Sequence, residues 1–357
     1  MAKPTIYDVA KVAGVGVGTV SRVLNNSTRV SPETQEKVTN AIHELGYRPS
    51  KVARQLSTGI QHRNIGAIMP FIAQPSNVER LRGMQLALSR LGNAFNLVLY
   101  NISEPDRFGE LLIEVVEQAA VDGVLIVTLD VPNEARELLA QASVPFVTLS
   151  DFDSGEPGVV SQDNVQGGYL ATRHLLELGH RRIAYVGDSF STSYGFPAKA
   201  SDLRYKGYLS ALEEVGERPH SEFLALGAHG EETAHALTLE LLALPRPPTA
   251  IFAMSDLQAV GCLRAIREAN LRVPDDISVI GFDDVQFSRY VGLTTIRQHL
   301  ELSGDLGMQL LVEMIANPEL VTAPVLPPLE LVIRSTTGPT EARTRSADQT
   351  GHSQLSY

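Results

Sequence analysis

The first 46 residues place apolar side chains at helical spacing in three short segments. In the first, which runs from Thr5 to Gly14, apolar residues recur three or four positions apart: Ile6, Val9, Ala10 and Ala13. A glycine-containing turn separates it from residues 17–24, and Pro32 opens a third segment that Gly46 ends. Two short helices joined by such a turn form a helix-turn-helix. The pattern therefore predicts a small all-α helix-turn-helix head.

From Asn64 onward, short apolar runs alternate with amphipathic helical stretches. We expect strands at residues 65–69, 97–100, 123–127, 146–149, 183–186, 250–253 and 277–280. Helices are expected at residues 79–91, 165–178, 203–215, 231–242 and 257–268. This alternation is typical of parallel sheets covered by helices. Because about 270 residues exceed one such core, the pattern predicts two similar α/β lobes with a cleft between them.

These patterns divide the chain into four parts. We predict a helix-turn-helix domain at residues 1–48, a linker at 49–62, a two-lobed core at 63–337 and a polar, disordered tail at 338–357. No apolar run is long enough to span a membrane, and the N-terminus lacks an apolar leader, so we expect a cytoplasmic protein without a membrane partner. Cys262 is the only cysteine, and neither a metal-ligand spacing nor a catalytic motif is present. We expect no cofactor, no metal and no enzyme activity.

The charge is distributed unevenly between these parts. The net charge of −11 by itself argues against binding to nucleic acid. Residues 1–63, however, hold nine Lys or Arg and four Asp or Glu, a net charge of +5, which leaves −16 for the rest. A small basic head on a large acidic body suggests a polyanion-binding module joined to a domain with another task.

The head carries a specific resemblance. The segment TIYDVAKVAGVGVGTVSRVLN, followed by VSPETQEKVTNAIHELGYRPS, closely resembles the head of the lactose-repressor (LacI/GalR) family of bacterial transcription regulators. The resemblance covers three helices and the following linker, and it extends more weakly along almost the whole chain. It implies a homodimeric regulator, expected to be a repressor, that binds double-stranded operator DNA. The segment from Gly14 to Gly18 superficially resembles a dinucleotide-binding glycine loop, but such a loop follows a β-strand, and here an expected helix precedes it.

The second helix of a helix-turn-helix enters the major groove. By resemblance, the head residues expected to contact DNA are Thr5, Val17, Gly18, Thr19, Ser21, Arg22 and Asn25. The Arg22 guanidinium suits guanine, because its N–H groups match the O6 and N7 acceptors of that base. The hydroxyls of Thr19 and Ser21 suit contacts with phosphate. Val17 and Gly18 either read bases or only permit close approach. Gly16 departs from the family, which generally has a capping serine at this position.

The linker resembles the family's hinge helix, two copies of which fold on DNA and open the minor groove. Ser50 can cap a short helix from Lys51 to about Ser57. By matching positions, Leu56 is the apolar wedge, Ala53 lies on the face that pairs with the partner's helix, and Arg54 approaches the groove or a phosphate. The alternative is an ordinary flexible linker.

The resemblance also implies a periplasmic-binding-protein-like core with an effector between its lobes. The matching positions are Arg204, Ser255, Asp256 and Asp283, although the family commonly has Asn where Ser255 stands. Phe71, just after the first expected core strand, is a candidate aromatic wall. A carboxylate and an arginine fork beside an aromatic wall provide the chemistry that a sugar ring needs. The effector is therefore expected to be a carbohydrate; the alternative is a nucleobase or another metabolite acting as a corepressor.

Each of these core positions has a structural alternative. Arg204 could pair with Asp202 or Asp188 at the surface, Asp283 could cap a turn, as Asp284 is expected to do, and Asp256 could cap the helix at residues 257–268. Residues 190–200 form either a lid that stacks on a sugar through its aromatic residues or a solvated insertion.

Overall fold

A computed structural model describes residues 5–24, 30–45, 63–117, 121–150, 157–189, 196, 199–320, 322 and 324–340. The chain divides into two compact units, of which one holds the N-terminal helices and the other nearly all of the core. The predicted hinge helix at residues 49–62 lies outside the described residues.

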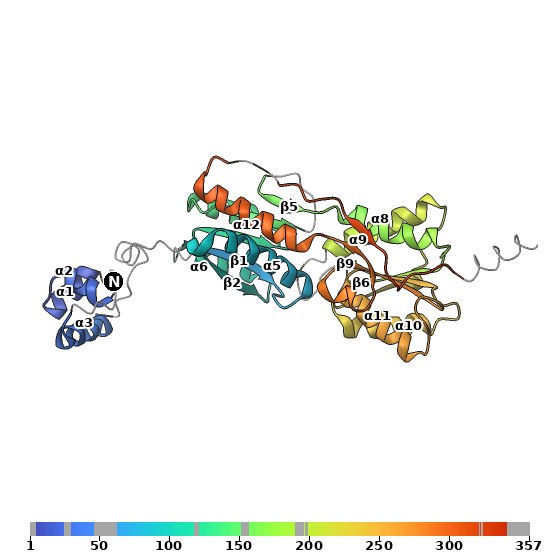
Figure 1. Cartoon of the computed structure of the whole chain (residues 1–357), viewed down its shortest axis with the longest axis horizontal. Helices are drawn as coiled ribbons and strands as arrows, with labels where there is room; N and C mark the ends of the chain where they lie inside the picture. Colours follow the sequence, from blue (N-terminus) through green and yellow to red (C-terminus); the bar gives the residue numbers. More distant parts are fainter. Residues whose placement is uncertain are drawn as a thin grey trace, which may run out of the picture. The chain divides into compact units, whose positions relative to one another are not determined.

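The head contains the helices α1 (Ile6–Ala13), α2 (Val17–Leu24) and α3 (Pro32–Leu45), as the spacing of apolar residues predicts (Figure 1). At the start of α1, the Thr5 backbone N–H and hydroxyl donate to the Asp8 carboxylate at 2.8 and 2.7 Å. Gly14 ends the helix with φ of 66°, a conformation that glycine adopts without strain. The helices enclose a small core of Val9, Ala10, Val20, Val23, Val38 and Ala41.

The first lobe of the core is built on a five-stranded sheet of order β2-β1-β3-β4-β5. Its strands are β1 (Arg63–Pro70), β2 (Phe95–Ile102), β3 (Gly123–Val127), β4 (Phe146–Ser150) and β5 (Val159–Ser161). Its helices are α5 (Pro75–Arg90), α6 (Arg107–Glu117), α7 (Asn133–Gln141) and α12 (Leu300–Ala316). The pairs β1–β3, β3–β4 and β4–β5 are parallel, as expected for strands joined by helices.

The second lobe is built on a six-stranded sheet of order β11-β10-β9-β8-β6-β7, parallel from β7 to β10. Its strands are β6 (Ile183–Asp188), β7 (Leu224–Gly227), β8 (Ala250–Ala253), β9 (Ser278–Asp283), β10 (Thr294–Arg297) and β11 (Glu330–Val332), the last of which is antiparallel to β10. Its helices are α8 (Asn164–Glu177), α9 (Lys199–Glu214), α10 (Glu231–Leu242) and α11 (Asp256–Glu268). The predicted two-lobed α/β core is confirmed.

Neither lobe is a continuous stretch of chain. Helix α12 follows the second-lobe strand β10, yet it packs beside α5 and on β3 and β4 of the first lobe (Figure 1). Glycines allow this close packing: a Cβ at Gly83 would lie 1.8 Å from the Glu301 carbonyl oxygen, and one at Gly304 would lie 1.9 Å from that of Arg80. The chain therefore crosses between the lobes more than once, and α5 is held firmly against α12.

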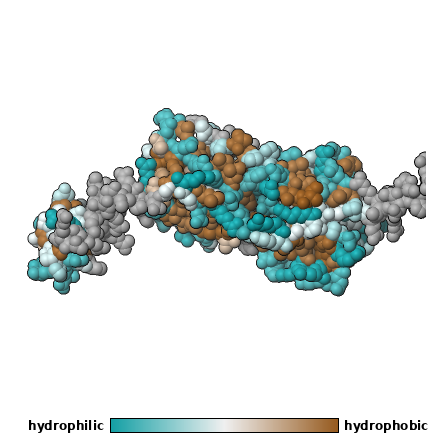
Figure 2. Space-filling model, in the orientation of Figure 1, coloured by the Kyte–Doolittle hydropathy of each residue, from teal (hydrophilic) through white to brown (hydrophobic). Residues whose placement is uncertain are grey.

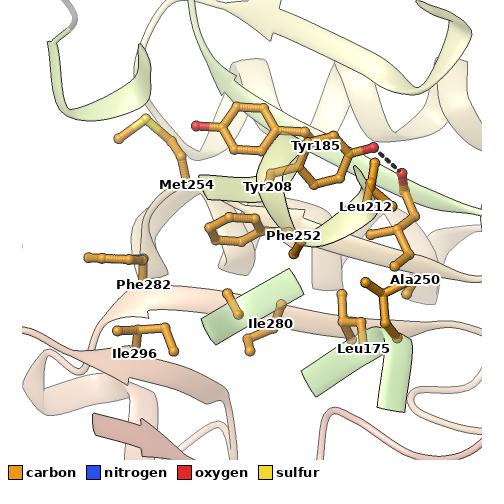
Figure 3. Packing of buried hydrophobic residues seen from close by; sticks show 14 residues of the cluster. Leu175, Tyr185, Tyr208, Leu212, Ala250, Phe252, Met254, Ile280, Phe282 and Ile296 are labelled. Atoms are coloured by element: carbon orange, nitrogen blue, oxygen red, sulfur yellow. Dashed lines mark hydrogen bonds between the residues drawn. The ribbon is translucent and has the colours of Figure 1, made fainter. Parts of the chain in front are cut away.

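Aromatic residues fill the second-lobe core around Tyr185, Phe252 and Phe282 (Figure 3). The rings of Tyr185 and Phe252 meet edge to face with centroids 5.3 Å apart, a favourable geometry for aromatic pairs. The buried Tyr208 hydroxyl donates to the Ile183 carbonyl oxygen at 2.9 Å, the dashed bond in Figure 3. On the outside, Figure 2 shows polar and apolar residues interspersed over the visible face of the core.

Candidate functional site

A cavity of about 120 Å³ lies between the two lobes, at the carboxyl ends of second-lobe strands. Strand register explains why its polar residues meet: Asp188 at the end of β6 pairs with Gly227 at the end of β7, and Val186 pairs with Ala253 of β8. The loops that follow these parallel strands therefore open at the same edge of the sheet, where ligands of open α/β sheets bind. The residues that line the cavity include Phe71, Asn77, Arg80, Asp188, Phe196, Lys199, Arg204, His229, Ser255, Asp283 and Gln298.

Arg204, on α9, is held on three sides. It is 3% exposed, its Nε donates to Asn164 Oδ1 at 2.8 Å and its Nη1 donates to the Met254 carbonyl oxygen. The guanidinium also stacks over the Phe282 ring, with its central carbon 3.8 Å from the ring centroid. Arg204 thus lines the cavity, and the alternative of a surface pair with Asp202 does not hold, because Asp202 pairs with Lys206.

Asp283 ends β9 and points its carboxylate toward Arg204. Its Oδ1 lies 3.8 Å from Arg204 Nη1 and accepts a hydrogen bond from Gln298 Nε2. Burial raises the pKa of Asp283 above the usual range, although the charge of Arg204 and the Gln298 bond oppose that rise. Its φ of 127° is a conformation that side chains rarely adopt, and such strain clusters at functional sites.

A histidine–carboxylate pair forms another part of the wall. His229 Nδ1 lies 3.1 and 3.2 Å from the two carboxylate oxygens of Asp188, which also accepts from Gln258 Nε2 at 3.1 Å. Burial alone would lower the pKa of His229, but the hydrogen bond and charge of Asp188 and the charge of Asp283 outweigh it. The pKa of His229 is therefore raised, which favours its protonated form.

Two phenylalanines form an apolar wall of the same cavity. Phe71, just after β1, meets Phe196 edge to face with centroids 5.4 Å apart. Phe71 has φ of 52°, and the Asn77 side chain donates to the Pro70 and Phe71 carbonyl oxygens at 2.8 and 3.2 Å, which fixes this turn. Phe196 belongs to the segment expected to be a lid or an insertion, and it lines the cavity; its neighbour Tyr194 lies outside the described residues.

Asp256 lies away from the cavity, contrary to its expected role as an effector ligand. It is 0% exposed, and its carboxylate accepts hydrogen bonds from Val285 N, Ser288 Oγ and Thr295 Oγ1. Desolvation raises the pKa of Asp256 to about 8. It anchors the loop after β9, while Ser255, which lines the cavity, caps α11 by accepting from Gln258 N at 3.2 Å.

Asp284 also differs from its expected role as a turn cap. Its two carboxylate oxygens accept from Arg297 Nε at 2.8 Å and Arg334 Nη2 at 2.6 Å. It is a buried ion-pair centre that ties β10 to the chain after β11. Asp163 acts as a helix cap, because its side chain accepts from Gln166 N at 2.9 Å at the start of α8.

On the head, α2 carries five of the residues predicted to contact DNA, and they differ in exposure, with Val17 packed against the head core. Val20 and Val23 are buried, Gly18 and Arg22 are exposed, and Val17, Thr19 and Ser21 are half-buried. A Cβ at Gly18 would lie 3.7 Å from Arg22 Nη2, so the guanidinium folds back beside this glycine. The other predicted contacts Asn25, Ala53, Arg54 and Leu56 lie outside the described residues.

Sequence reasoning missed several cavity residues: Asn77, Arg80, Lys199, His229 and Gln298. His229 and Gln298 follow β7 and β10, short strands that the apolar pattern did not reveal, so a better strand assignment would have exposed them. Asn77 and Arg80 lie on a helix, and only the packing of α5 against α12 shows which way they point.

Within the described ranges, no helix is long and apolar enough to cross a membrane. Among these same residues, no group of three or more His, Cys, Asp or Glu side chains lies so that it could hold a metal ion.

A helix-turn-helix head joined to a two-lobed α/β core with a polar cavity defines a DNA-binding protein with a small-molecule site. Residues 5–50 match the family described as bacterial regulatory proteins, lacI family, and residues 172–337 match a periplasmic binding protein-like domain. The chain is 35% identical to the HTH-type transcriptional repressor PurR of Mannheimia succiniciproducens over 92% of this chain and 97% of that protein. The chain therefore belongs to the lacI family of bacterial transcription regulators.

Solved structures support the same assignment. The transcriptional regulator CelR in complex with cellobiose is 31% identical, with a TM-score of 0.66 over 93% of this chain and 99% of that one. The Lac repressor dimer bound to operator and the anti-inducer ONPF is 30% identical, with a TM-score of 0.68 over 94% of this chain and 100% of that one.

Proposed function

We propose that this protein is a homodimeric repressor whose affinity for its operator is controlled by a sugar bound between the two lobes. The observation that carries the proposal is the placement of Asp283 and Arg204 beside Phe71 in one cavity. The carboxylate accepts from hydroxyls, the guanidinium donates to ring or hydroxyl oxygens, and the aromatic face covers the apolar side of a sugar ring. The similar CelR structure contains cellobiose.

The proposed mechanism couples the cavity to the head through the arrangement of the lobes. A ligand that contacts both lobes stabilises their closed arrangement, and the change reaches the head through the dimer. Such coupling is typically about 1–3 kcal/mol and is reciprocal, so operator DNA should weaken effector binding by the same factor. The opposite sign, in which the ligand acts as a corepressor, is the alternative outcome.

The dimer is supported by the similar Lac repressor dimer and by the surface of the first lobe. Val78 and Leu86 on α5, Leu99 on β2 and Ile113 on α6 are each more than a third exposed. A partner surface is a common reason for a soluble protein to expose apolar side chains together. We propose that a second copy of this chain covers them.

Titration of the full-length protein tests the proposal. An operator is first selected from random DNA, and its binding is followed by fluorescence anisotropy while sugars and nucleobases are added. A sugar should shift operator affinity about 5- to 150-fold, and Asp283→Asn should abolish the shift while DNA binding without sugar remains. If only nucleobases shift the affinity, the corepressor alternative replaces the sugar.

The DNA contacts are tested separately by Arg22→Ala. Loss of a bidentate guanine contact should cost about 1–3 kcal/mol per half-site and relax the base preference at that position. Selection from a randomised operator measures both effects, with Lys37→Ala, an exposed cation on α3, as the control. An unchanged preference would contradict a base-reading role for Arg22.

A further inference from the structure

Phe196 comes from the second lobe but packs inside the first. It lies in the chain between β6 and α9, both of which belong to the second lobe. Its side chain is 6% exposed and belongs to a hydrophobic cluster of first-lobe residues that includes Ile68 of β1, Ile126 of β3 and Phe108 of α6. This aromatic ring therefore crosses the boundary between the lobes at the cavity that it lines.

The first lobe meets this ring with turns that are fixed in place. Phe71 contacts Phe196 edge to face, and the Asn77 side chain holds the turn that carries Phe71. Thr128, which also lines the cavity, follows β3 with φ of 54°, and its N–H donates to the Leu149 carbonyl oxygen at 2.9 Å. These two first-lobe turns therefore keep their positions at the cavity through hydrogen bonds.

A charged contact restrains the same connection three residues further along the chain. Lys199, the first residue of α9, forms an ion pair with Asp130, which follows β3 of the first lobe. Both side chains are 45% exposed, so the pair contributes little stability by itself. It does place the start of α9 against the first lobe. A buried ring and an ion pair thus join this connection to the opposite lobe.

The cavity that these residues line is small. Its volume of about 120 Å³ is less than half of the roughly 300 Å³ at which clefts for drug-sized ligands begin. A disaccharide belongs to that size class, whereas a single sugar ring is much smaller. Phe196 cannot turn aside to enlarge the cavity without moving its apolar ring from the first-lobe cluster into water. The cavity is therefore suited to a ligand with one ring.

We propose that Phe196 sets the size of the effector and limits it to a monosaccharide. This inference rests on the proposed sugar site and specifies the ligand class within it. Asp283 and Arg204 bind the hydroxyls of one ring, and the wall of Phe71 and Phe196 leaves no room for a second. Phe196 is thus a buried part of the cavity wall rather than a solvated residue of an insertion.

Calorimetry on the full-length protein tests the proposal with one-ring sugars and two-ring derivatives: glucose with maltose and cellobiose, galactose with lactose, and ribose with phenyl riboside. In the wild type, the one-ring sugar should bind about tenfold or more tightly than its derivative, because the second ring clashes with the wall. Phe196→Ala removes the ring and should lower this preference by about fivefold or more.

Phe108→Ala is the matched control, because Phe108 is 7% exposed in the same cluster but does not line the cavity. This variant should lose stability while its size preference stays within about twofold of wild type. Phe196→Leu is a milder second variant in case the alanine variant does not fold. It keeps an apolar side chain in the cluster and should lower the preference by less than alanine does.

The outcomes separate the size limit from the sugar effector itself. A two-ring derivative that binds the wild type as tightly as its one-ring parent would overturn the size limit and leave the sugar effector intact. The same conclusion would follow if the Phe196 variants kept the wild-type preference, or if Phe108→Ala changed it equally. If no sugar of either class binds, the sugar effector is rejected and the size limit with it.

Discussion

The two lobes share one architecture but contribute differently to the cavity. The second lobe supplies a polar network. Arg204 donates to Asn164, Asp283 accepts from Gln298, and Asp188 is bonded to His229 and Gln258. The first lobe supplies Phe71, which meets Phe196 from the chain between β6 and α9, and the guanidinium of Arg80, whose helix is positioned by close packing on α12. We infer that the second lobe sets how strongly a ligand is held and that the first lobe sets which ligand is chosen.

The largest expected effect tests the second-lobe network. Arg204→Met should lower the free energy of unfolding by about 3–5 kcal/mol, because it leaves the Asp283 carboxylate buried without its compensating charge. Urea denaturation measures this loss. The control is Arg173→Met, which breaks an exposed pair with Glu177 and should cost at most about 1 kcal/mol. Equal losses in both variants would contradict a buried network.

The first-lobe wall should matter for the ligand more than for stability. Phe71→Ala removes an edge-to-face pair with Phe196, worth about 0.5–1.5 kcal/mol beyond buried area. We expect effector affinity to fall roughly tenfold, measured by calorimetry. Phe71→Tyr keeps the ring and should stay close to wild type. A loss equal to that of an Asp283 variant would remove the distinction between the lobes.

Sequence reasoning went further for the architecture than for the cavity. Apolar spacing located α1, α2 and α3 and the central strands, because periodicity records burial directly. It missed the short strands β5, β7, β10 and β11 and the crossing of α12 to the first lobe, since three or four residues carry little periodic signal. Topology of this kind is set by contacts between segments far apart in the chain.

The carboxylates show the same limit at the level of single residues. Asp256 follows β8 and Asp283 ends β9 of the same sheet, and both were expected at the ligand. Only the fold shows that Asp283 faces the cavity, whereas Asp256 turns inward to Ser288 and Thr295. Strand ends identify an edge, but the direction of each side chain there depends on the local backbone.

The His229–Asp188 pair predicts that the stability of the second lobe depends on pH. Burial opposes the protonated form of His229, but the hydrogen bond and charge of Asp188 outweigh burial and raise the pKa in the folded protein. Protonation of His229 therefore adds stability at pH values below the usual histidine pKa. That stability is lost as pH rises through the higher folded pKa. The melting temperature of wild type should therefore exceed that of His229→Gln most at about pH 6 and least at about pH 8. If the difference in melting temperature between wild type and His229→Gln grew with pH, the predicted direction would be wrong. His220→Gln, at an exposed site, is the control.

The smallest expected effect tests the boundary between the lobes outside the cavity. Gln286 begins the short helix η3 (Gln286–Arg289), which follows Asp283. Its side-chain Oε1 accepts from Arg82 of α5 at 2.6 Å, and its backbone N–H donates to Glu79 Oε1 of the same helix at 3.1 Å. This contact joins the first lobe to the loop that follows Asp283, the carboxylate proposed to bind the effector. If it forms only when the lobes are closed, Gln286→Ala should weaken effector binding by about two- to fivefold, since an exposed hydrogen bond contributes in the lower part of the usual range of about 0.5–1.5 kcal/mol. Calorimetry at fixed pH measures the change, and tighter binding in the variant would show that the contact opposes closure instead.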